Sequence, residues 1–360
     1  MEKDHTKSEL LSHFLEPAFY VKDGSITHSN LAAQSLLLTP GTPIAGLISA
    51  GSDEYTEFTQ GCLYLTMKIH DQLYTSSVTA EKDYHLFITQ NASDDASLQA
   101  YSLAARELRT PLSGIMMATK KYFKQLSESS DPQLQKQAAY INQNLYRMLR
   151  IVSNMSDAGK YANAIDVHLE QTNITSALQE MLTLIESTCA ESGYKFRFIC
   201  PEEPVYGPVD REKLERGVYN LISNALKFAG TASCLEVSVT YNTKRLYITV
   251  KDSGKGIDSA IRDTIYHRYR RRPGLEDHIH GIGLGMLLAR STASIHSGAL
   301  LMEVVPDQGA KITMSISLKQ KELTLRSPYT RIDYSGEHDH CLIELSDCLP
   351  VEQYVPKNLK

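Results

Sequence analysis

Three short stretches of the chain carry residue types that suit a phosphorylated nucleotide. The first places Asn220, Asn224 and Lys227 at steps of four and three residues, which puts them on one face of a helix. Amide oxygens suit Mg²⁺, a hard cation that prefers oxygen ligands, and a lysine suits phosphate. Phe228 follows and can pack near a base. This stretch predicts the metal and phosphate side of a pocket.

The second stretch, 252–257, follows an expected strand with a carboxylate and glycines. Asp252 can accept a hydrogen bond from the exocyclic amine of adenine, which would select adenine over guanine. Gly254 and Gly256 let the backbone approach the base closely, and Ile257 ends the stretch. Alone, this pattern is usually only a turn.

The third stretch is rich in glycine and precedes a helix expected at 286–293. Gly281, Gly283 and Gly285, with Leu284 between the last two, form a turn into that helix. The N–H groups and dipole of a helix start favour phosphate. Because the three stretches would rarely occur together in this order by chance, we interpret them as one site for ATP and Mg²⁺.

Composition sets limits on the rest of the chain. Its 360 residues suggest two or three domains, and 42% hydrophobic with 22% charged residues is ordinary for a soluble protein. A net charge of -5 gives no field that would attract nucleic acid. The apolar runs are too short to span a bilayer, and the N-terminus has no apolar core. Six scattered cysteines form no C-x-x-C pair, which argues against zinc or a disulfide framework. We expect a cytoplasmic protein.

The nucleotide stretches need a scaffold of helices and strands, and residues 160–320 predict an α/β sandwich. Expected helices cover 173–188 and 210–228, and expected strands cover 235–239, 246–250, 300–304 and 311–316. The order of elements and motifs resembles the ATP-binding catalytic domain of histidine kinases, of the type shared with gyrase, Hsp90 and MutL ATPases. The resemblance implies that the three stretches bind Mg-ATP.

Residues 94–159 predict two long helices, the second starting at Pro132 after an Asp131 cap. A heptad seam runs along this second helix, through Leu134, Ala138, Ile141, Leu145, Met148, Val152 and Met155. On the first helix, Leu108, Leu112 and Ile115 share a face. One hairpin cannot cover such seams, so we expect two copies to form a four-helix bundle and hence a homodimer. A hairpin packed within one chain is the alternative.

The first helix contains Glu107, Thr110, Pro111 and Leu112 at the spacing of the H-E-x-x-T/N-P-L motif. This pattern resembles the phosphoacceptor helix of sensor histidine kinases, and the resemblance implies that Glu107 acts in proton transfer and Thr110 positions a water. The position of the phosphoacceptor histidine, however, is Arg106.

Arg106 cannot do the chemistry of the histidine that it replaces. An arginine stays cationic and has no free lone pair to attack phosphorus, whereas a neutral imidazole has one. No histidine occurs between His85 and His168 that could substitute. Autophosphorylation at the family's position is therefore excluded. Arg106 is either a solvated bundle residue or a positive charge set near an acidic partner or an ATP phosphate.

Residues 1–93 predict a small α+β domain. Asp23 and Gly24 form a hairpin turn between strands expected at 18–21 and 25–28, Asn30 fits a helix cap, and later strands are expected at 64–69 and 85–89. This order resembles a PAS sensor domain. A module that only contacts other proteins is equally compatible, and no ligand is indicated.

Two segments complete the chain. Residues 258–280 would cover the nucleotide as a lid, with Arg268, Arg270, Arg271 and Arg272 as phosphate candidates and with flanking residues His278 and His280. The extension 321–360 contains an expected strand at 341–345. It is too short for a domain and would pack on the catalytic domain or reach a partner.

The sequence thus predicts a multi-domain α+β signalling protein of the histidine kinase family. The first hypothesis is a homodimer, joined through 94–159, that binds ATP without phosphorylating itself and acts by conformation or as a phosphatase of a response regulator. The second is an active histidine kinase that transfers phosphate in trans to a histidine of a different protein or of a heterodimer partner, such as a partner histidine kinase. The third is an ATP-gated interaction module. None of the three involves nucleic acid.

Overall fold

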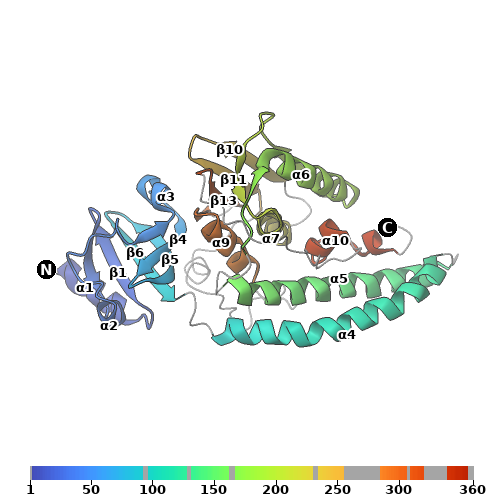
Figure 1. Cartoon of the computed structure of the whole chain (residues 1–360), viewed down its shortest axis with the longest axis horizontal. Helices are drawn as coiled ribbons and strands as arrows, with labels where there is room; N and C mark the ends of the chain where they lie inside the picture. The colour runs from blue at the N-terminus through green and yellow to red at the C-terminus, as the bar shows by residue number, and fades with distance from the viewer. Residues whose placement is uncertain are drawn as a thin grey trace.

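The computed structural model describes residues 2–91, 96–127, 131–161, 167–229, 234–254, 284–305, 309–319 and 339–355. Two lobes built on β-sheets lie beside a long helical hairpin (Figure 1). The N-terminal lobe comprises residues 2–91 and the second lobe comprises 167–319. The hairpin of α4 (Ala96–Ser127) and α5 (Pro132–Tyr161) runs alongside the second lobe. No helix in the described ranges is long and apolar enough to cross a bilayer.

The N-terminal lobe is a twisted antiparallel sheet with short helices around it. Its elements are α1 (Glu2–Ser12), β1 (Ala18–Lys22), β2 (Ser25–Ser29), α2 (Leu31–Ser35), β3 (Ile48–Ala50), α3 (Ser52–Glu57), β4 (Cys62–Ile69), β5 (Gln72–Glu81) and β6 (Tyr84–Asn91). Asp23 and Gly24 both take positive φ, 49° and 76°, in the turn that the sequence predicts. Asn30 caps α2 as predicted, and its Oδ1 accepts from Ala33 N at 2.9 Å. The sequence did not indicate β5 or α3.

The second lobe is the α/β unit that the nucleotide stretches require. Its elements are β7 (Glu170–Asn173), α6 (Ile174–Glu191), β8 (Lys195–Ile199), β9 (Tyr206–Val209), α7 (Arg211–Ala229), β10 (Cys234–Tyr241), β11 (Arg245–Asp252), α9 (Gly285–Ile295), β12 (Leu300–Val305) and β13 (Gly309–Ser317). The strand order is β12-β13-β11-β10-β8, and β7 pairs with β9 separately. Leu235, Val237 and Val239 of β10 are buried in one hydrophobic core with residues of α6, α7 and α9, so the alternation predicted for 235–239 is confirmed.

The sheets of the two lobes join edge to edge. Strand β4 pairs antiparallel with β12, with Tyr64 opposite Leu300 and Cys62 opposite Met302, which gives one sheet of 11 strands. Gly61 lies just before this contact, where a Cβ would come within 2.5 Å of the Met302 carbonyl oxygen. The close approach of the two backbones therefore requires glycine there. The guanidinium of Arg290, on α9, covers the Tyr64 ring at 4.1 Å.

The hairpin begins its second helix where the sequence predicts, since Asp131 Oδ1 accepts from Gln133 N at 2.8 Å. The heptad seam divides, however, into an inner and an outer half. Leu145 and Val152 are buried, with Ala138, whereas Leu134, Ile141 and Met148 are 40%, 47% and 44% exposed. On α4, Leu112 is buried, but Leu108 and Ile115 are exposed. One hairpin thus covers only half of the apolar positions.

The prediction of a strand at 341–345 is wrong. The segment forms α10 (His340–Glu344), followed by the short 3-10 helix η1 (Val351–Tyr354). Asp339 Oδ1 accepts from Cys341 N at 2.8 Å, and this cap starts a helix that the apolar run alone did not reveal. Both elements contact α5, and α10 also contacts α6 and α7 (Figure 1), so the expectation that the extension packs on the α/β unit is confirmed.

Candidate nucleotide site

Two of the three nucleotide stretches meet where α7 passes the start of α9. Leu284 precedes Gly285, the first residue of α9. A Cβ added to Gly285 would lie 3.0 Å from Asn220 Oδ1 and 3.5 Å from Asn224 Oδ1. The absence of a side chain at Gly285 therefore lets the helix start approach both amides. The fold brings together residues that are about 60 positions apart, as the sequence predicts.

The carboxylate of the second stretch is buried and held by backbone donors. Asp252, 7% exposed at the end of β11, accepts from Gly254 N at 2.9 Å and from Ala310 N at 3.2 Å. Burial raises the pKa of Asp252 above its usual 3.8, and these N–H groups act in the opposite direction. A carboxylate has lone pairs for further donors, so Asp252 can accept from an amino group.

The second stretch also touches α7. A Cβ added to Gly254 would come within 2.8 Å of Ala229 Cα at the end of that helix. Phe228, the preceding residue, is 62% exposed and can cover a ligand. Gly256, Ile257, Gly281 and Gly283 lie outside the described residues, as do the lid arginines Arg268, Arg270, Arg271 and Arg272 and the histidines His278 and His280.

The two asparagines differ in their fit to Mg²⁺. Asn220 is fully buried, its Nδ2 donates to the Arg216 carbonyl oxygen at 2.9 Å, and its Oδ1 accepts from Arg150 Nη2 at 3.5 Å. A guanidinium at this oxygen opposes a second cation. Asn224 is only partly buried, and its amide faces Gly285. The amide of Asn224 is thus placed where it could serve as a metal ligand, whereas Asn220 could do so only if Arg150 moves away.

Charged residues from the hairpin and the C-terminal segment complete the site, and sequence reasoning did not predict them. Lys227 Nζ lies 2.7 Å from Asp347 Oδ2, and Arg150 Nη1 lies 2.8 Å from the same oxygen. Glu344 lies between Arg150 and Arg216, 3.4 Å from the Nε of each. These partners are far apart along the chain and follow no motif, so only the fold reveals them.

The kinase-like motif of α4 points to solvent. Arg106, Glu107 and Thr110 are all exposed to solvent. Within the part of the chain that the structure describes, no hydrogen bond or ion pair joins them to Asn220, Asn224 or Lys227. Pro111 lies inside α4, which continues without interruption past it.

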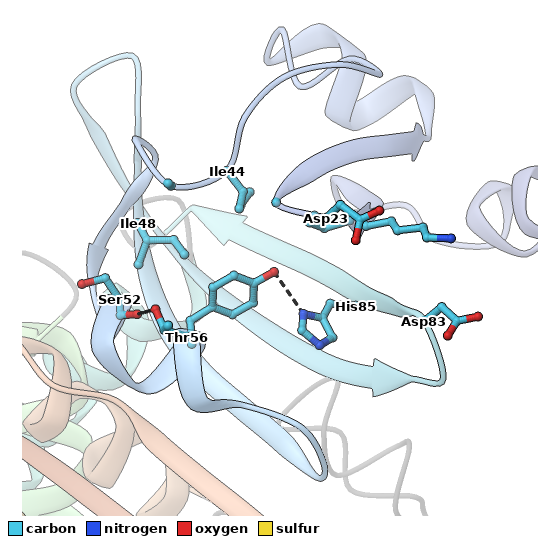
Figure 2. A pocket seen from close by; sticks show the side chains of 12 residues that line it. Asp23, Ile44, Ile48, Ser52, Thr56, Asp83 and His85 are labelled. Carbon is cyan, nitrogen blue, oxygen red and sulfur yellow. Dashed lines mark hydrogen bonds between the residues drawn. The ribbon is translucent and has the colours of Figure 1, made fainter.

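The N-terminal lobe has a separate pocket of about 400 Å³. Figure 2 shows Ile44 and Ile48 on one side of it, Ser52 and Thr56 of α3 on another, and His85 facing the interior. Tyr55, also on α3, has its hydroxyl 3.0 Å from His85 Nδ1. Burial lowers the pKa of His85 and raises that of Tyr55 to about 12. The pair therefore offers neutral hydrogen-bonding groups in a pocket whose lining is partly apolar and partly charged, through Lys22, Asp23 and Asp83.

Comparison with known proteins agrees with the architecture of the second lobe. Residues 209–320 match the family described as Histidine kinase-, DNA gyrase B-, and HSP90-like ATPase. Hybrid signal transduction histidine kinase D of Dictyostelium discoideum is 28% identical over 232 residues, 62% of this chain and 15% of that protein. Histidine protein kinase DivJ of Caulobacter vibrioides is 28% identical over 244 residues, 64% of this chain and 40% of that protein.

Among solved structures, histidine kinase ThkA in complex with the response regulator protein TrrA is similar, with a TM-score of 0.42 and 16% identity over 87% of this chain and 98% of that chain. The chain spans less than half the length of the two curated relatives, 15% and 40%. The second lobe contains an ATPase domain of the histidine kinase type. Both curated relatives are histidine kinases, and the chain is similar to them over 62% and 64% of its length.

Proposed function

We propose that this chain binds Mg-ATP in the second lobe and signals without phosphorylating itself. The observation that carries the proposal is the contact of Gly285 with Asn220 and Asn224, because it unites the metal side and the phosphate side of the pocket. In this proposal Asp252 contacts adenine, and Lys227 contacts phosphate. Asn224 is the first metal ligand, and Asn220 becomes a second one when Arg150 moves away from it.

Because Arg106 stands in place of the acceptor histidine, we expect no autophosphorylation. The neighbouring residues suit a different activity. Glu107 and Thr110 are exposed on α4 and can reach a partner protein. In a phosphatase reaction on a response regulator, Thr110 would position a water against the aspartyl phosphate and Glu107 would take part in proton transfer. A protein that signals only by its ATP-dependent conformation would need neither residue.

Two alternatives remain distinct from this proposal. A kinase acting in trans would transfer phosphate to a histidine of another kinase, using the same nucleotide pocket. An ATP-gated interaction module would bind ATP and transfer nothing. Incubation with γ-labelled ATP, alone and with a partner kinase that carries the usual histidine, separates these outcomes. Label on the partner supports the kinase in trans, and loss of label from a phosphorylated response regulator supports the phosphatase.

We also propose that residues 94–159 form a homodimer and that residues 1–93 are a PAS-like input domain. Leu134, Ile141 and Met148 supply an exposed apolar stripe with a spacing of seven, which a second hairpin would cover in a four-helix bundle. The pocket around Tyr55 and His85 has the size of a small-molecule site and combines apolar side chains with a few polar ones, which supports a sensor role.

A further inference from the structure

The C-terminal segment 339–355, which we call the strap, lies between the hairpin and the nucleotide helix α7. We propose that Arg150 and Lys227 form a phosphate subsite of the nucleotide pocket, and that the strap occupies this subsite with Asp347. The strap must then release Asp347 before the terminal phosphates of ATP bind. This inference rests on the proposed ATP binding and adds a residue of the hairpin and an internal competitor to it.

The subsite is built from two cations on different helices that converge on one oxygen. Asp347 Oδ2 lies 2.7 Å from Lys227 Nζ and 2.8 Å from Arg150 Nη1. The side chains of Lys227 and Arg150 are only 9% and 5% exposed, and that of Asp347 is 10% exposed. Lysine and arginine together suit a phosphate oxygen at least as well as a carboxylate oxygen.

The subsite lies at the phosphate end of the pocket. Arg150 also donates from Nη2 to Asn220 Oδ1, at 3.5 Å, and Asn220 in turn lies against Gly285 at the start of α9. The adenine end, at Asp252, instead contacts Gly254 and the end of α7. Asp347 is thus linked through Arg150 and Asn220 to Gly285 at the start of α9, where phosphate is expected.

Asp347 is charged when it occupies the subsite. Burial acts to raise the pKa of its carboxyl, but the positive charges of Arg150, Lys227 and Arg147 outweigh burial and lower the pKa. An ionised carboxylate and a phosphate group cannot share these two cations, because their charges repel. The strap and the nucleotide phosphates therefore compete.

The strap also holds the second lobe against the hairpin. Glu344 lies 3.4 Å from both Arg150 of α5 and Arg216 of α7. Gln143 of α5 donates to the Leu349 carbonyl oxygen at 2.8 Å, and Tyr194 donates to that of Cys348 at 2.7 Å. Asp347 is a further link, because it contacts Arg150 of α5 and Lys227 of α7. Its displacement by ATP would remove these contacts, so nucleotide binding would weaken the attachment of the second lobe to the hairpin.

The test uses the full chain and the isosteric change Asp347→Asn, which removes the competing charge and keeps the shape. Calorimetric titration with Mg-ATP should show affinity about tenfold to a hundredfold higher than that of the wild type, the range expected from one charge-assisted contact. Inorganic tripolyphosphate should also bind the variant more tightly than the wild type, and the affinity for adenosine should be the same in both. Glu352→Gln is the control, because it removes an exposed charge of the same strap.

A second variant tests the strap without removing a buried charge. Ser223 Oγ lies 3.4 Å from Cys348 Sγ, so Ser223→Cys places two thiols side by side. Diamide, which takes two electrons and two protons from the pair, should form a disulfide that fixes the strap and weakens ATP binding. Dithiothreitol should restore binding, and diamide-treated wild type is the control. Peptide mapping verifies that residues 223 and 348 are joined.

The possible results separate the two proposals. If every form binds adenosine and Asp347→Asn binds ATP no more tightly than the wild type, the strap does not compete and this inference is wrong. If the oxidised and the reduced Ser223→Cys variant bind ATP with equal affinity, this inference is also wrong. If no form binds ATP or adenosine, the proposed function fails and this inference fails with it.

Discussion

Arg245 at the start of β11 and Glu54 in α3 form an ion pair across the boundary of the two lobes, with 3.3 Å between Nε and Oε1. Their side chains are only 9% and 10% exposed, and Ser315 Oγ donates to Glu54 at 2.6 Å. Helix α3 also lines the pocket of the N-terminal lobe with Tyr55 and Thr56 (Figure 2). One short helix therefore joins that pocket to the sheet of the ATPase domain.

The substitution Arg245→Met should weaken the union of the two lobes. It leaves Glu54 buried without its cation, and loss of one partner of a buried pair costs about 3 to 5 kcal/mol. Urea unfolding should report this loss, and amide exchange should rise in β4 and β12. Arg197→Met is the matched control, because Arg197 pairs with Glu236 at the surface, where a pair contributes about 0 to 1 kcal/mol. Equal effects of the two substitutions would contradict a buried interface.

Adenosine binding should depend on the charge of Asp252. Because burial raises the pKa of Asp252 above 3.8, the carboxylate gains its proton at a higher pH than an exposed aspartate does. The adenine amine then loses its acceptor, so affinity should fall as the solution is acidified. Adenosine is the ligand to titrate, since it has no phosphate that changes charge.

The matching variant is Asp252→Asn. It should bind adenosine about tenfold more weakly near neutral pH, the cost of a charge-assisted hydrogen bond, and its affinity should vary less with pH than that of the wild type. A wild type and variant with the same affinity at every pH would show that adenine lies elsewhere.

Arg106→His should restore a nucleophile to α4. The wild-type protein with Mg-ATP should acquire no acid-labile, base-stable phosphate, because no imidazole lies at that position. In the variant, the imidazole stands beside Glu107, which can act as the base. Labelling by γ-labelled ATP measures the outcome, and Arg106→Gln is the control for loss of positive charge. A labelled histidine in the wild type would overturn the assignment.

The exposed half of the heptad seam, Leu134, Ile141 and Met148, should form the dimer interface. Ile141→Asp puts a charge on an exposed apolar stripe and should yield a folded monomer in light scattering, because the change would bury an unpaired charge in the bundle. Leu145→Asp acts on a side chain that is buried within one hairpin, so it should lower the helix content as well.

Lys136→Glu is the control for the added negative charge. This exposed residue lies five positions before Ile141, about 140° around the helix, and should leave the dimer intact. A wild type that is monomeric at all concentrations would contradict the four-helix bundle.

Local patterns in the sequence were sufficient for many of the helices and strands and for the nucleotide motifs. The alternation in β10 and β11, the Asp131 and Asn30 caps and the glycine that begins α9 each act within a few residues, so the chain specifies them directly. The 341–345 run failed as a strand because a short apolar run suits either a strand or a helix, and the Asp339 cap decided it.

The sequence by itself determined the three nucleotide motifs and the loss of the acceptor histidine, because these depend on residue types at fixed local spacing. Only the tertiary structure decided that Asp347 pairs with Lys227 and Arg150, and that β4 pairs with β12. These contacts join segments from 120 to about 240 positions apart. Burial, charge and backbone register select such contacts after the chain has folded, and no local spacing encodes them.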